Sequence, residues 1–196
     1  MKIGLSNISF QKQAVAKCSV VQNQKKIPCT IFELDSSIPE DSVYFSPLCG
    51  KSPWKNAFYL GSIGNDLYIG TTAKVYVMEN DKQECISACE VDDVFDEKDE
   101  LVFIETAPLY NSMNPVRNLK YAGETMLNFL VQTAKKNKKE EFVVASPYTG
   151  AVKFYEKCGF KKNDFDENMS MKLDKKEYNS FVKRNEEHVG QIEFIG

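Results

Sequence analysis

The chain has 196 residues, a length that fits one domain and allows a substantial core to be buried. Apolar residues make up 42% and charged residues 27% of the chain, which is ordinary for a soluble globular protein. The net charge of -3 argues against broad nucleic-acid binding, because neutralising phosphates needs a basic surface. Since no apolar run approaches the length of a membrane span, we expect a single domain over residues 1–196 that binds neither nucleic acid nor membranes.

The sequence offers little support for a metal site. Six cysteines are present, but their spacing matches no zinc pattern, and Cys85 and Cys89 lack the further partners that zinc needs. The single histidine, His188, lies near the C-terminus, which argues against a histidine-based metal site or triad. The stretch from Met1 to Gln13 lacks the continuous apolar core of a signal peptide. We therefore expect no metal, and a cytoplasmic protein with reduced cysteines.

The first third of the chain predicts one clear strand. Met1 to Gln24 shows no period, whereas Lys26 to Leu34 alternates as a half-buried strand does. Turn residues fill Asp35 to Asp41, and Pro53 suits the first position of a short helix that runs to Ile63. We expect the aromatic residues of this helix to cover a face of the core, with a binding groove as the alternative: Trp54, Phe58 and Tyr59.

The next segment predicts an antiparallel meander. Gly64 to Asp66 suggests a turn, and Leu67 to Glu79 suggests a long strand. A strand interrupted at Gly70 is the alternative. Asn80 and Asp81 close a hairpin whose second strand is Glu84 to Val91. We interpret the acidic run from Asp92 to Asp99 as a solvated loop, with attraction of a cation as the alternative.

A parallel unit follows the meander. Leu101 to Thr106 begins with an apolar run typical of a buried strand, and Phe142 to Ala145 is a second one. Between them, apolar residues at helical spacing predict a long helix: Met126, Leu127, Leu130, Val131 and Ala134. Two parallel strands joined by a crossover helix are the natural packing solution. The predicted fold is an α/β domain (α+β with a mixed sheet), in which an antiparallel meander precedes a parallel strand–helix–strand unit.

The last quarter predicts two helices and two strands. Gly150 to Cys158 forms a short helix capped by Gly159, with Ala151, Phe154 and Cys158 on its buried face and Tyr155 offset from it. After a polar turn at Asn163 to Asn168, Met169 to Leu173 is a strand. Asp174 to Glu177 resembles a capping box for a helix through Lys183, and Ile192 to Ile195 adds an edge strand or contacts a partner.

The start of the long helix is a candidate anion site. Backbone N–H groups are unpaired at a helix N-terminus, where the dipole also favours a phosphate. Gly123 allows close backbone approach, and Arg117 and Lys120 add positive charge. Physics alone favours the plainer interpretation, an ordinary helix start with solvated basic residues.

Two stretches of this half carry a resemblance to a known family: Asn118 to Gly123, which reads NLKYAG, and Ala151 to Phe160, which reads AVKFYEKCGF. They resemble the pyrophosphate motif Arg/Gln-x-x-Gly-x-Gly/Ala and the signature Ala-x-x-Phe-Tyr-x-x-x-Gly-Phe of the GNAT superfamily of acyl-CoA-dependent N-acyltransferases. Asn118 departs from the usual Arg or Gln and Tyr121 from the first glycine, whereas Gly123 matches. The resemblance covers Ala73 to Lys172; residues 1–65 match poorly, and residues 174–196 are an extension.

The resemblance implies acetyl-CoA as co-substrate. It places Tyr155 as the acid that protonates the leaving thiolate and Glu105 as the base for the amine. For Tyr155 the alternative is a packed tyrosine, and for Glu105 a solvated carboxylate. Backbone N–H groups of Ile104 to Ala107 would hold the thioester carbonyl. The residues expected to contact acetyl-CoA are Ile104, Thr106, Ala107, Arg117, Asn118, Lys120, Tyr121, Ala122, Gly123 and Glu124.

Two functions remain open after the sequence. The first is an N-acetyltransferase that moves an acetyl group from acetyl-CoA to an amine of unknown identity, on a small molecule or a protein. The second is a GNAT-fold protein without catalysis that serves as an interaction module, which the weak pyrophosphate motif favours. Pairing into a homodimer also stays open.

Overall fold

The computed structural model describes residues 12–70, 73–92, 97–110, 118–163 and 169–196. The helices are α1 (Pro39–Ser42), α2 (Leu60–Ile69), α3 (Ala122–Lys136), α4 (Val152–Cys158) and α5 (Tyr178–Val189). The strands are β1 (Gln13–Gln22), β2 (Lys25–Leu34), β3 (Lys74–Asn80), β4 (Cys85–Asp92), β5 (Lys98–Thr106), β6 (Leu119–Lys120), β7 (Glu141–Val144), β8 (Lys161–Lys162), β9 (Met171–Asp174) and β10 (Glu193–Phe194). Within the described ranges, no helix has both the length and the apolar content that a membrane crossing needs.

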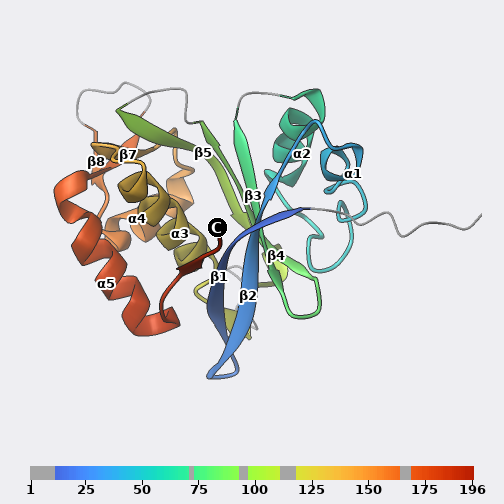
Figure 1. The fold of residues 1–196 in the computed structure, drawn as a ribbon, viewed down its shortest axis with the longest axis horizontal. Helices are drawn as coiled ribbons and strands as arrows, with labels where there is room; N and C mark the ends of the chain where they lie inside the picture. The colour runs from blue at the N-terminus through green and yellow to red at the C-terminus, as the bar shows by residue number, and fades with distance from the viewer. Residues whose placement is uncertain (1–11, 71–72, 93–96, 111–117, 164–168) are drawn as a thin grey trace, which may run out of the picture.

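The strands form one mixed sheet between two layers of helices. Its order is β10-β1-β2-β3-β4-β5-β7-β9-β8, with β6 paired to β1. Helices α3, α4 and α5 cover one face, and α1 and α2 lie on the other (Figure 1). The larger hydrophobic core lies on the α3 face, and a second core lies on the α2 face around Trp54 and Ile63. The predicted fold class is confirmed: β1 to β5 form an antiparallel meander, and β5 and β7 are parallel.

The first strand went unrecognised in the sequence. β1 pairs with β2 through a two-residue turn at Asn23 and Gln24, which both have a positive φ, as tight hairpins require. Ala16, Cys18 and Val20 alternate as buried residues along β1. This period is present in the sequence, but the lysine and glutamine residues around it obscure it.

The segment from Leu60 to Ile69 corrects two predictions, a turn at Gly64 to Asp66 and a strand that begins at Leu67. It is helix α2, which buries Leu60, Ile63 and Leu67 on one face. Gly64 serves close packing here, because an added Cβ would lie 3.2 Å from the Cβ of Phe45. The helix ends at Gly70, whose left-handed φ of 70° caps it, and β3 begins only at Lys74. The predicted helix start at Pro53 is wrong, since residues 53–59 form turns.

Several C-terminal predictions are confirmed and one is wrong. Gly159 ends α4 with a φ of 96°, and β10 pairs with β1 as an edge strand. Asp174 makes no capping hydrogen bond, so the capping box is absent; its carboxylate instead lies near Lys172 and Lys176. Helix α5 also extends beyond Lys183 to Val189. The predicted polar turn lies mostly outside the described residues.

The acidic run is only partly a loop. Residues 93–96 lie outside the described part of the chain, but Asp92 ends β4 and Asp99 belongs to β5. Asp99 is buried and pairs with the ammonium of Lys139 at 3.4 Å. The interpretation of this run as a solvated loop is therefore wrong for Asp99.

Candidate functional site

The two parallel strands part after four residues. Pairing of β5 with β7 runs from Lys98 opposite Glu141 to Leu101 opposite Val144, and the N–H of Ala145 donates to the carbonyl of Leu101 at 3.0 Å. Beyond that point β5 continues to Thr106 paired with β4 alone. The C-terminal half of β5 therefore has an edge that β7 does not cover.

A β-bulge marks the place where the strands part. Val91 of β4 pairs with Leu101 and Glu90 pairs with Phe103, so residue 102 is the extra one. Leu101 consequently packs in the α3-side core, while Phe103 packs in the α2-side core. Regular alternation along the strand predicts Glu105 on the same face as both residues; the bulge makes this wrong for Leu101.

The N-terminus of α3 lies beside this edge. An added Cβ on Gly123 would lie 3.5 Å from Oγ1 of Thr106 and 3.7 Å from Cζ of Phe154. The end of β5, the first turn of α3 and helix α4 thus meet at Gly123. We call this meeting point, with the free edge of β5, the splay site.

The residue that precedes α3, its N-cap, is a non-glycine residue in the left-handed region. Tyr121 has a φ of 69°, and its carbonyl accepts the first bond of the helix, from the N–H of Thr125 at 2.8 Å. Because this position takes a positive φ, a glycine would suit it sterically. The Tyr121 ring instead stacks on His188 of α5, with centroids 5.2 Å apart and planes 2° apart. This stack gives the departure from the motif a structural role.

The other predicted residues of this loop are placed as follows. Asn118 and Lys120 are exposed, and Ala122 is buried in the first turn of α3. The carbonyl of Asn118 accepts from the N–H of Asn23 at 3.1 Å, which ties the loop to the β1–β2 turn. Glu124 lies in the first turn of α3, and the predicted Arg117 lies outside the described residues.

The predicted backbone donors of β5 divide into two groups. The N–H of Ala107 donates to the carbonyl of Ile86 at 3.0 Å, so this amide is already used. Successive amides of a strand point to opposite edges. The amides of Ile104 and Thr106 therefore point to the edge of β5 that β7 does not cover.

Tyr155 is buried, with 4% of its surface exposed. Sequence reasoning offset it from a buried face made by Ala151, Phe154 and Cys158; instead, Tyr155 and Cys158 are the buried residues of α4. Burial raises the pKa of the Tyr155 phenol, and the nearby Cys158, Tyr59 and Cys89 raise it further. The phenol therefore keeps its proton at neutral pH. Tyr59 packs against the α2-side core, so the Tyr155 phenol is influenced by a group from the other face of the sheet.

Glu105 caps a helix that is distant in sequence. Its carboxylate accepts from the N–H groups of Phe58, Tyr59 and Leu60 at 2.6, 2.7 and 3.0 Å. These groups form the N-terminus of α2, where a negative charge is stabilising. Both carboxylate oxygens are engaged, so the geometry favours a structural role for Glu105 over the predicted base and over a solvated carboxylate.

Replacing Glu105 with glutamine separates these two roles. As a cap, the residue loses its charge and one acceptor, so we expect unfolding to become easier by about 1–2 kcal/mol. We expect kcat to change less than about threefold, whereas loss of a general base lowers it about 100-fold or more. Thermal unfolding and steady-state kinetics measure the two effects, and a large fall in kcat at unchanged stability contradicts the capping role.

Aromatic side chains line the α2 side of the splay site. Four rings form a row in which neighbouring ring centroids lie close together. The centroid distances are 5.1 Å from Phe103 to Tyr59, 4.8 Å from Tyr59 to Phe58 and 6.4 Å from Phe58 to Tyr148. Phe58 is 76% and Tyr148 59% exposed. The expectation of core aromatics is right for Trp54, whose Nε1–H donates to the carbonyl of Cys85, and wrong for Phe58. Tyr148 was not predicted, because a single exposed tyrosine in a loop gives no sequence signal.

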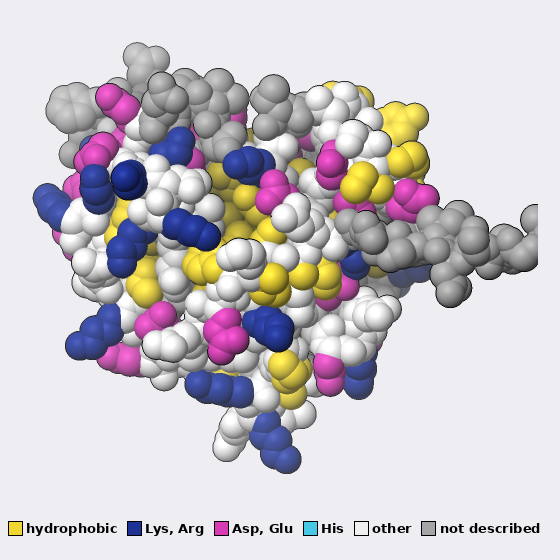
Figure 2. Space-filling view, in the orientation of Figure 1, with side chains coloured by type: hydrophobic (Ala, Val, Ile, Leu, Met, Phe, Trp, Pro, Cys, Tyr) yellow, Lys and Arg dark blue, Asp and Glu magenta, His cyan; other side chains and the backbone are white. Residues whose placement is uncertain are grey.

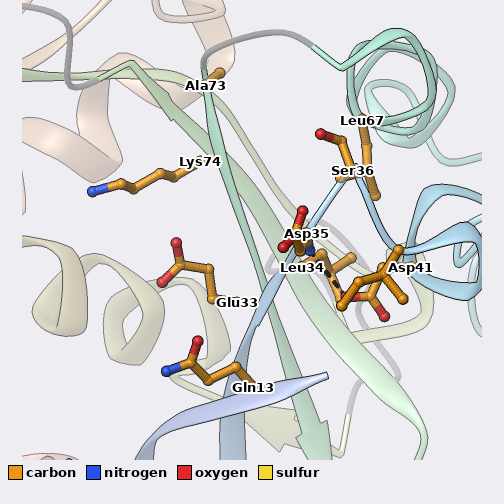
Figure 3. A pocket seen from close by; sticks show the side chains of 10 residues that line it. Gln13, Glu33, Leu34, Asp35, Ser36, Asp41, Leu67, Ala73 and Lys74 are labelled. Carbon is orange, nitrogen blue, oxygen red and sulfur yellow. Dashed lines mark hydrogen bonds between the residues drawn. The ribbon is translucent and has the colours of Figure 1, made fainter. Parts of the chain in front are cut away.

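A separate pocket lies at the far end of the strands from Thr106. It has a volume of about 270 Å³ and is lined by the start of β1, the end of β2, α2 and the start of β3. Figure 3 shows Glu33 and Lys74 on one side, and Asp35 and Asp41 joined by a hydrogen bond on the other. On the face shown in Figure 2 basic and acidic side chains are interspersed, and hydrophobic ones gather near the centre and in a smaller group at the upper right.

Comparison with known proteins identifies the fold. No family profile and no curated protein sequence matches this chain. Spermidine/spermine N-acetyltransferase SpeG from Vibrio cholerae aligns at 17% identity and a TM-score of 0.51, covering 78% of this chain and 98% of SpeG. Tetrahymena GCN5 aligns at 15% identity with a TM-score of 0.53, and the alignment covers 74% of this chain and 94% of GCN5. A putative N-acetyltransferase from Lactobacillus plantarum aligns at 14% identity with a TM-score of 0.54, and the alignment covers 74% of this chain and 97% of that protein. The fold common to these structures and to this chain is the GNAT fold.

Proposed function

We propose that this chain, which has the GNAT fold, is an N-acetyltransferase that moves the acetyl group of acetyl-CoA to an amine. The observation that carries the proposal is the buried phenol of Tyr155 on α4. The neighbouring residue on this helix, Phe154, meets Gly123 at the N-terminus of α3. The fold alone is shared by many activities, so the proposal depends on this site.

The splay site fits the groups that acetyl-CoA presents. The first N–H groups of α3 lack acceptors within the helix and suit a diphosphate. Gly123 leaves room beside Thr106 and Phe154, where a side chain would otherwise stand. Amides of Ile104 and Thr106 point to the free edge of β5 and would donate to the thioester carbonyl. When bound, acetyl-CoA supplies an acetyl group activated as a thioester.

The residues of the site then have separate tasks. The amine nitrogen forms a bond to the acetyl carbon, and the carbon–sulfur bond breaks. Ile104 and Thr106 amides stabilise the negative oxygen of the tetrahedral intermediate, and Tyr155 gives its proton to the departing sulfur. Because the Glu105 carboxylate is engaged by α2, we assign loss of the amine proton to water. The aromatic residues on the α2 side face the incoming amine.

An inactive interaction module remains the second candidate. The stack of Tyr121 on His188 at a motif glycine position is the observation that favours it. A screen of small amines and lysine peptides with acetyl-CoA, followed by thiol release, discriminates the two. We expect acceptor-dependent release of CoA; release no faster than without protein, across acceptors of all classes, contradicts the proposed reaction.

Gly123 offers a test of where acetyl-CoA binds. In Gly123→Ala the new Cβ meets its neighbours at ordinary van der Waals distance, so folding and affinity should change little. In Gly123→Val two further methyl groups project toward Thr106 and Phe154, and we expect affinity for acetyl-CoA to fall about 30-fold or more. Calorimetry measures the affinities, and circular dichroism confirms folding. Wild-type affinity in a folded Gly123→Val protein places acetyl-CoA elsewhere.

A further inference from the structure

The ammonium group of Lys12 lies in a cage of three side chains from other parts of the chain. It pairs with the carboxylate of Glu79, in β3. The same nitrogen lies 4.8 Å from the ring centroid of Phe32, in β2, and 4.8 Å from that of Tyr44, after α1. Carboxylate and aromatic faces thus surround one ammonium group.

The cage is built around a buried carboxylate. The Glu79 side chain is 5% exposed and the Lys12 side chain 19% exposed. The Tyr44 hydroxyl donates to the same Glu79 oxygen that Lys12 contacts. Burial raises the pKa of Tyr44 and also raises the pKa of the neighbouring Cys85 thiol to about 12. Both groups therefore stay neutral, and the positive charge opposite Glu79 comes from Lys12.

This arrangement is chemically selective. A carboxylate taken out of water needs a cation close by, since leaving it unpaired is costly. Two aromatic faces attract an ammonium group through their negative π surfaces. A primary ammonium also donates charged hydrogen bonds to the carboxylate, whereas a metal ion donates none and a neutral alcohol donates one without a positive charge.

We propose that Phe32, Tyr44 and Glu79 form a binding site for a primary alkylammonium group, which the chain fills with its own Lys12. The lysine is tethered beside the cage, so its effective concentration there excludes free amines. The cage lies at the end of β3, apart from Tyr155, and the proposal does not depend on acetyl transfer.

Removal of the Lys12 side chain tests the proposal. We expect Lys12→Ala to melt about 5–10 °C below the wild type, because Glu79 is left without its cation. About 50 mM n-butylammonium chloride should restore at least half of this loss by binding to the folded state, and should leave the wild type unchanged. Equal concentrations of potassium chloride and n-butanol, which lack either the ammonium or the charge, should restore nothing.

Two further variants make the result specific to the cage. Lys12→Ala combined with Glu79→Gln should gain nothing from butylammonium, because the carboxylate is gone. Lys12→Met keeps an apolar stem in place of the lysine chain, so butylammonium should not enter. If Lys12→Ala does not fold alone, a cooperative transition should return when it is refolded with the amine. No recovery by butylammonium, or equal recovery in the double variant, overturns the proposal.

Discussion

Replacing Tyr155 with phenylalanine is expected to lower kcat about 100-fold or more, because the departing thiolate loses its proton donor. The affinity for acetyl-CoA should change less than about threefold and the melting temperature by less than about 3 °C, since one oxygen atom is removed and the ring contacts with Phe154 and Phe160 remain. Single-turnover kinetics, calorimetry and thermal unfolding measure the three quantities.

The same measurement has a matched control at Tyr148. This tyrosine is exposed and lies on the α2 side of the splay site, so Tyr148→Phe should leave kcat within about twofold. Because burial raises the pKa of Tyr155, wild-type kcat should show no loss from phenol ionisation at pH values up to about 10. Unchanged turnover in Tyr155→Phe assigns the acid to water or another group. A much lower melting temperature instead identifies the hydroxyl as a structural partner.

The second large effect is expected at Glu90, where stability should fall as pH rises. Glu90 of β4 is buried, and its pKa is raised to about 7 by burial, by the nearby carboxylate of Asp66 in α2 and by Asp92. The ordinary pKa of the group is 4.5, so between these values the folded protein holds more protons than the unfolded chain. Its stabilising contribution is complete below the lower pKa and is lost as pH rises through about 7.

Replacing Glu90 with glutamine should remove this dependence. Glutamine stays neutral and can donate to Asp66, so the variant should be more stable than the wild type at pH 8 by up to about 3 kcal/mol. At pH 4, below both pKa values, the two proteins should be nearly equal. Denaturant unfolding at both pH values measures the difference. An identical pH dependence in the two proteins shows that Glu90 ionises normally in the fold.

Local periodicity was enough to predict the body of the fold. The apolar spacing of α3, the buried runs of β5 and β7 and the glycine after α4 each predicted an element without knowledge of the rest. The order of these elements then required a parallel crossover. The sequence did not predict β1 and α2, because charged residues or glycine obscured their period. In α2 this residue is Gly64, which allows close contact with Phe45.

The site was less predictable because it depends on contacts distant in sequence. Glu105 caps α2 across more than 40 residues, and no spacing rule reveals this pairing. The β-bulge at residue 102 reverses the face of the sheet on which the following side chains lie, and it has no sequence signal of its own. The stack of Tyr121 on His188 also joins two distant elements. Gly123 and α4, the helix that carries Tyr155, by contrast meet at the splay site as the motifs suggested, because each motif belongs to a locally encoded helix.

A calorimetric titration of acetyl-CoA into the wild-type protein tests the central claim most directly, since every proposed role at the splay site presumes this complex. We predict one saturable site with a Kd of about 100 μM or lower, within the range of about 1 μM to 1 mM that is common for enzyme Michaelis constants. The folded Gly123→Val variant should show the loss of affinity described above. Absence of binding to the folded wild-type protein at about 1 mM acetyl-CoA contradicts the account and favours the interaction module.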